Sequence, residues 1–111
     1  MEKVTLFYLE RPDIKISMQI YFNEKDQLFF DGYDSGKAVE KCFGDSDYEY
    51  IHTIEPEEVN KFYNLFSIRD GDKSALLQEI KNRFSVNEAY SLFGAFMRGN
   101  NINFSSFTWC S

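Results

Sequence analysis

A short acidic segment containing two tyrosines is the part of this sequence best suited to recognising another molecule. Asp45, Asp47, Tyr48, Glu49 and Tyr50 follow one another with a single intervening serine. Carboxylates attract basic groups, and tyrosine rings contribute strongly to the energetics of protein interfaces. We expect these residues to form part of a binding surface for a basic protein. A strand would alternate them between two faces, so the loop residues Asp45 and Asp47 are the safest exposed contacts.

The same region carries the charge of the chain. Nine acidic residues and two lysines lie between Asp31 and Glu58, a net charge of −7, whereas the whole chain has a formal charge of −6. A charge block of this kind can steer a basic partner towards the protein, or it can serve only to keep the domain soluble. Lys and Arg are dispersed along the chain, which disfavours direct binding of nucleic acid.

Two further motifs have residue types that bind ions, but neither completes a known pattern. The run from Asp31 to Gly36 lacks both the G-x-G-x-x-G fingerprint and the Gly-Lys-Ser/Thr ending of a phosphate loop. We interpret it as a strand end, a tight turn and a helix N-cap. The run that begins at Asp45 resembles the opening of a calcium loop, yet Tyr50 and Pro56 occupy the positions that require Gly and Glu. The sequence therefore predicts no metal site and no cofactor.

Catalysis has little support in the residue types. His52 is the only histidine, and Cys42 is a conceivable nucleophile beside it, although nothing marks its thiol as activated. A carboxyl pair such as Asp45 and Glu49 could support hydrolysis, but acids are too numerous here for one pair to stand out. A small carboxylate-dependent hydrolase is therefore retained as an alternative to the binding function.

Hydrophobic periodicity predicts the elements that must position these residues. Ile14, Ile16, Met18, Ile20 and Phe22 alternate with mostly polar residues, the pattern of a strand with one buried face. The segment before it is β-rich on both faces, which favours a central strand. We predict strands at 4–9, 14–22, 27–33, 48–54 and 102–109. Helices are predicted between Ser35 and Gly44, at 56–66 and at 73–84. A third long helix should begin at a Ser85–Glu88 capping box, bury Val86 and end at Gly99.

This element order, β-β-β-α-β-α-α-α-β, is typical of an α+β fold with an antiparallel sheet. We expect residues 1–111 to form a single domain in which the helices containing Phe62, Ile80 and Phe93 cover one face of the sheet. The hydrophobic fraction of 43% and the aromatic fraction of 18% are sufficient for a stable core, despite the acidity of the chain.

The compartment is predicted from what the sequence contains. No apolar run approaches the length of a membrane span, and residues 1–4 do not resemble the start of a secretion signal. Cys42 and Cys110 are isolated and are expected to be reduced, dispensable thiols. These observations favour a cytoplasmic protein that has no contact with membranes.

The run from Asp31 to Gly36, the segment from Gly44 to Tyr50 and the closing Phe107-Thr108-Trp109 resemble small, acidic, uncharacterised bacterial α+β proteins of about this length. Proteins of this size, charge and class are frequent among the immunity proteins of bacterial toxin systems. The resemblance implies a non-enzymatic acidic protein-binding module that neutralises a basic toxin. The remaining alternative is a structural domain that forms homodimers through an exposed sheet edge.

Overall fold

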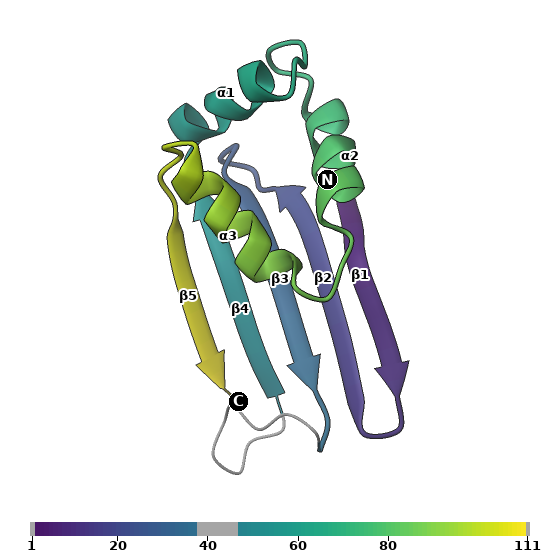
Figure 1. The fold of residues 1–111 in the computed structure, drawn as a ribbon. Coiled ribbons are helices and arrows are strands. Elements are labelled where there is room, and N and C mark those ends of the chain that lie inside the picture. Colours follow the sequence, from purple (N-terminus) through teal and green to yellow (C-terminus); the bar gives the residue numbers. More distant parts are fainter. Residues whose placement is uncertain (1, 38–46, 111) are drawn as a thin grey trace.

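One antiparallel sheet forms the base of the molecule. The computed structural model describes residues 2–37 and 47–110. Figure 1 shows the five strands side by side in the order β1-β2-β3-β4-β5. Their bounds are β1 (Lys3–Arg11), β2 (Ile14–Phe22), β3 (Leu28–Ser35), β4 (Asp47–Ile54) and β5 (Ser105–Cys110).

Local sequence explains the first part of this sheet. The alternation of β2 places Ile16, Met18 and Ile20 on a buried face, as predicted. The turn between β2 and β3 is held by Asn23, whose Oδ1 accepts hydrogen bonds from the backbone N–H groups of Lys25 and Gln27, both at 3.0 Å. This use of an asparagine side chain to close a turn fixes the register of the strands that follow.

The helices α1 (Pro56–Leu65), α2 (Lys73–Phe84) and α3 (Ala89–Gly99) follow β4 and lie on one side of the sheet (Figure 1). Pro56 occupies the first turn of α1, where its missing N–H has no intrahelical acceptor in any case. The carboxylate of Asp72 caps α2 by accepting a hydrogen bond from the backbone N–H of Ala75 at 3.1 Å. An α+β fold with helices on one face was predicted, and the structure confirms it.

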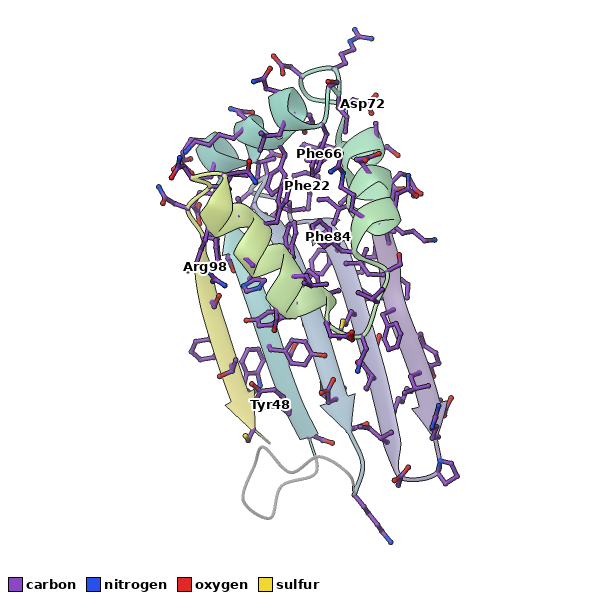
Figure 2. All side chains as sticks on the ribbon, viewed as in Figure 1. Phe22, Tyr48, Phe66, Asp72, Phe84 and Arg98 are labelled. Carbon is purple, nitrogen blue, oxygen red and sulfur yellow. The ribbon has the colours of Figure 1, made fainter. Side chains whose placement is uncertain are left out.

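An aromatic stack fills the space between the helices and the sheet. The rings of Phe30 in β3, Phe93 in α3 and Phe62 in α1 are fully buried, and the Phe93 centroid lies 5.7 Å from each of the other two. Figure 2 shows Phe66 and Phe84 pointing into the same space. The predicted burial of Phe62, Ile80 and Phe93 is confirmed.

The order of elements differs from the predicted order between β3 and β4. The described strands and helices follow one another as β-β-β-β-α-α-α-β. The short helix expected between Ser35 and Gly44 falls largely on residues 38–46, which lie outside the described residues. The first strand also differs, because β1 is an edge strand of the sheet and not a central one.

The predicted start of the third helix was wrong. The helix begins at Ala89, its N-cap residue Glu88 makes no capping hydrogen bond, and Val86 is exposed. The hydroxyl of Ser85 instead donates to the backbone carbonyl of Lys81 and completes the last turn of α2. Serine satisfies either kind of helix end, so the same letters fit both arrangements.

The state of Cys110 is a further correction. Cys110 is disulfide-bonded in the structure, whereas a reduced thiol was expected. The other cysteine of the chain, Cys42, lies outside the described residues. Within residues 2–37 and 47–110, no helix is long and apolar enough to cross a membrane.

Candidate functional site

The sheet has a second face, which the helices do not cover and which we call the outer face. Because side chains alternate along a strand, the residues that neighbour the buried positions of β2, β3 and β4 point to this side. The strand register adds alternate residues of β5. The outer face gathers acids and aromatic rings, namely Tyr21, Phe29, Asp31, Tyr33, Asp47, Glu49, Phe107 and Trp109.

A pair of carboxyl groups lies at its centre. Asp31 in β3 and Glu49 in β4 are diagonal neighbours in the strand register, and a protonated Glu49 can donate a hydrogen bond to the carboxylate of Asp31. Partial burial, this hydrogen bond and the negative charge of Asp31 raise the pKa of Glu49 to about 7. The hydroxyl of Tyr21 donates to Asp31 Oδ2 at 3.4 Å. Glu49 therefore retains its proton up to a pH close to neutral.

Tyr33 and Asp47 form a second acidic contact on the same face. Tyr33 lies opposite Glu49 in the register of β3 and β4, and its side chain is exposed. A hydrogen bond to Asp47 is the main cause of its raised pKa. The hydroxyl of Tyr33 is thus a donor to a carboxylate at the surface, and its ring is presented to solvent.

An aromatic pair on β5 borders the acids. The rings of Phe107 and Trp109 lie 5.1 Å apart, and these residues are 64% and 37% exposed. The register places Trp109 opposite Glu49 and Phe107 opposite Ile51. Apolar rings and carboxyl groups are therefore neighbours across β4 and β5, an arrangement that suits a ligand with both apolar and basic groups.

Strand alternation divides the residues predicted to bind a partner. Asp47 and Glu49 lie on the outer face, whereas Tyr48 and Tyr50 point to the side of the helices. Tyr50 is only 4% exposed and belongs to the core, and its hydroxyl donates to Asp34 Oδ1 at 2.6 Å. Figure 2 places Tyr48 at the end of β4 that the helices leave uncovered. Asp45 lies outside the described residues.

Sequence reasoning missed several residues of the outer face, namely Tyr21, Asp31, Tyr33, Phe107 and Trp109. The signal that could have found them is the period of two in the segments 27–33 and 102–109. It becomes informative only when the register of β3, β4 and β5 is known, because that register sets which acids and rings are neighbours.

The glycines of the 31–36 run have structural roles. A Cβ atom at Gly32 would overlap the ring of Tyr50, so the absence of a side chain makes room for that ring. Gly36 has a φ of +114°, a conformation that L side chains rarely adopt. A strand does end in this run, as predicted, but it ends later than expected: Asp34 and Ser35, which were expected at a turn and a helix N-cap, belong to β3 and pair with β4.

His52 is a buried link between three elements. Its Nε2 donates to the backbone carbonyl of Tyr90 in α3 at 2.9 Å, which leaves Nδ1 to accept from the hydroxyl of Ser106 in β5 at 2.7 Å. The imidazole lies parallel to the Tyr90 ring at 3.8 Å. Burial, reinforced by the positive charge of Arg98, lowers the pKa of His52 to about 4.

This environment argues against catalysis by His52. A serine hydroxyl bonded to a histidine has the form of a nucleophile and its base, but a base with a pKa near 4 has little affinity for the proton that it must accept. The predicted companion Cys42 lies outside the described residues. We therefore interpret His52 as a polar residue that is satisfied within the core.

The other clusters and pockets of the described residues do not bring together as many acidic and aromatic side chains as the outer face does. Among the residues that the structure describes, no group of three or more His, Cys, Asp or Glu side chains is arranged to hold a metal ion. A surface pocket of about 430 Å³ after α3 is lined by Arg98, Asn101, Ile102, Asn103 and Phe104, none of which is acidic.

Comparison with known proteins gives no independent guide to function: no family model, curated protein or solved structure matches this chain.

Proposed function

We propose that this protein is a non-enzymatic, acidic protein-binding module whose outer face receives a basic protein. The observation that carries the proposal is the combination of Asp31, Asp47 and Glu49 with the exposed rings of Tyr33 and Trp109 on one uncovered sheet face. Aromatic side chains act as anchors at interfaces, and a patch of negatively charged side chains accelerates association with a basic surface.

The carboxyl pair makes this binding sensitive to pH. A guanidinium or ammonium group placed beside Asp31 and Glu49 favours the ionised form of Glu49, so binding displaces the proton of Glu49. Because the pKa of Glu49 is raised to about 7 in the free protein, affinity increases as the pH rises through that value. An acidic residue without such a neighbour would be ionised at this pH and would show no comparable dependence.

The sharpest form of the proposal is a bacterial immunity protein that neutralises a basic toxin. Its support is the acidity of the chain, its α+β architecture and the resemblance of its sequence to small bacterial proteins of this kind. The cytoplasmic location expected from reduced thiols is not part of this proposal, because Cys110 is disulfide-bonded and stable disulfides are rare in the reducing cytosol.

A pair of matched charge variants tests the binding function. Asp47→Asn with Glu49→Gln removes two acids from the outer face, and Glu57→Gln with Asp70→Asn removes two exposed acids from the helical part. Immobilised wild type and both double variants are used to capture proteins from lysate of the source cell. The captured partner is then purified, and its association rate with each protein is measured against salt concentration.

We expect the outer-face variant to associate several-fold more slowly at low salt and to lose most of the salt dependence. The control variant removes at least as much negative charge, because Glu49 is partly protonated near pH 7, and it should keep the association rate close to that of the wild type. Equal behaviour of the two variants would show that only net charge matters, and the outer face would not be the binding surface.

The carboxyl pair supports one second candidate, a carboxylate-dependent hydrolase. A carboxyl group with a pKa near 7 beside another acid is suited to general acid catalysis. Turnover of a panel of glycoside and ester substrates that disappears in Glu49→Gln would favour this enzyme. No turnover in the wild type would leave the binding proposal as the better account of the pair.

A further inference from the structure

Among the described residues, β5 and β1 form the two edges of the sheet, and these edges differ in composition. β1 carries Lys3, Glu10 and Arg11, and its pairing with β2 is irregular between Thr5 and Phe7. Charges and bulges of this kind discourage other strands from pairing with an edge. β5 has the sequence SSFTWC, with no charged residue and no proline, and each of its residues is exposed.

The backbone of β5 has hydrogen-bonding capacity for a further strand. In the described part of the chain, β4 is the only strand that pairs with β5. In an antiparallel strand, alternate N–H and C=O groups point away from the existing neighbour. An extended segment is the form of polypeptide that satisfies such a row of donors and acceptors, as in recognition by strand addition.

The side chains beside this edge indicate the composition of that segment. Phe107 and Trp109 are the first outer-face residues that an added strand would contact, and Glu49 lies directly behind Trp109. A Lys or Arg side chain from the added strand would cross the Trp109 ring on its way to the carboxyl pair. Cation–π attraction operates within ~6 Å of a ring centroid, which matches the distance between adjacent strands.

We propose that the β5 edge binds an extended basic segment of the partner, which adds to the sheet as a sixth strand and places its basic side chains over Phe107 and Trp109. This inference rests on the proposed function and specifies how the partner is held. A second copy of the chain fits the edge less well, because each copy carries a net charge of −6.

The test uses a short synthetic peptide in which arginine alternates with valine, and isotope-labelled full-length protein observed by NMR. One control peptide has the same side chains with N-methyl groups on two backbone amides that would face β5. A second replaces each arginine by glutamate. The protein variant Phe107→Lys adds a positive charge at the edge, and Leu92→Lys adds the same charge at an exposed apolar residue of α3.

We expect the arginine peptide to shift and protect the backbone amides of β5, with little effect on those of β1. Two blocked hydrogen bonds should weaken binding about tenfold, and the glutamate peptide should not bind measurably. Phe107→Lys should lose binding by a similar factor, and Leu92→Lys should retain it.

Three results would overturn the inference, and they separate it from the proposed function. Equal binding of the N-methylated peptide, with shifts confined to Asp31 and Glu49, would leave the acidic face as a binding site and remove the edge. No binding of any peptide would count against both proposals. A dimeric wild type that becomes monomeric in Phe107→Lys would show that the edge is occupied by a second copy.

Discussion

Replacing Gly32 by alanine tests how closely the sheet and the core are fitted together. A Cβ atom at this position would overlap the ring of Tyr50, which lies opposite Gly32 in the register of β3 and β4. The ring is almost fully buried and its hydroxyl is bonded to Asp34, so it cannot move aside without losing this hydrogen bond. We therefore expect Gly32→Ala to destabilise the protein although it adds only one methyl group.

The magnitude follows from two contributions. Overpacking of a well-filled core costs about 1–3 kcal/mol. Loss of the hydrogen bond between Tyr50 and Asp34 adds about 1 kcal/mol. The expected decrease in the free energy of unfolding is therefore about 2–4 kcal/mol, a large part of the stability of a domain of this size.

Urea unfolding followed by circular dichroism measures this decrease. Gly99→Ala is the matched control, because nothing lies within 4 Å of a Cβ atom at the end of α3. We expect that variant to be neutral or up to about 1 kcal/mol more stable. The double variant with Tyr50→Leu should lose less stability than the sum of its single variants, with a coupling of about 1–3 kcal/mol. A loss below about 0.5 kcal/mol in Gly32→Ala, or strict additivity, would refute the proposed overlap.

Three further variants test other parts of the structure. Phe93→Ala should lower the free energy of unfolding by about 3–5 kcal/mol, because the ring is fully buried, whereas its exposed neighbour Leu92→Ala should lose less than about 1 kcal/mol in the same measurement. Glu49 binds its proton more tightly in the folded protein than in the unfolded chain, so its contribution to stability is complete below pH 4.5 and is lost as the pH rises through about 7. In unfolding experiments between pH 4.5 and 8, Glu49→Gln should abolish this decrease in stability. The control Glu57→Gln should not abolish it. The pH dependence of stability due to His52 runs in the opposite direction, because its lowered pKa means that its contribution is present above pH 6.5 and is lost as the pH falls towards about 4. His52→Phe should remove this loss at low pH. The same variant should cost about 1–3 kcal/mol at pH 7, because the Tyr90 carbonyl and the Ser106 hydroxyl lose their hydrogen-bond partner.

The parts of the fold that were predicted correctly depend on neighbours in sequence. The alternation of β2 and the stripes that bury Phe62, Ile80 and Phe93 are periodic patterns, which report burial directly. The start of α3 was misassigned because Ser85 fits a capping box and also fits the end of α2, where its hydroxyl is bonded. Whether Ser85 caps α3 or ends α2 depends on how the segment between these two helices packs.

The candidate site was predicted only in part, for a different reason. Alternation along 47–54 was sufficient to separate Asp47 and Glu49 from Tyr48 and Tyr50, but it did not show which of the two sets faces solvent. The raised pKa of Glu49 requires Asp31, and the position of Trp109 beside Glu49 requires β5 to pair with β4. Each of these contacts joins residues that are distant in sequence, and period alone does not report such pairs.

The position of β5 has a consequence for how the sheet assembles. β1 is joined to β2, and β2 to β3, by short turns, whereas Thr53 pairs with Ser105 after three intervening helices. Closing so long a loop carries a larger entropic cost, and contacts of this kind form late in folding. We expect the edge of β4 to be open in the chain that has just formed its helices. The fifth strand then completes the sheet, and in doing so it brings Phe107 and Trp109 beside Glu49 as the last step of folding.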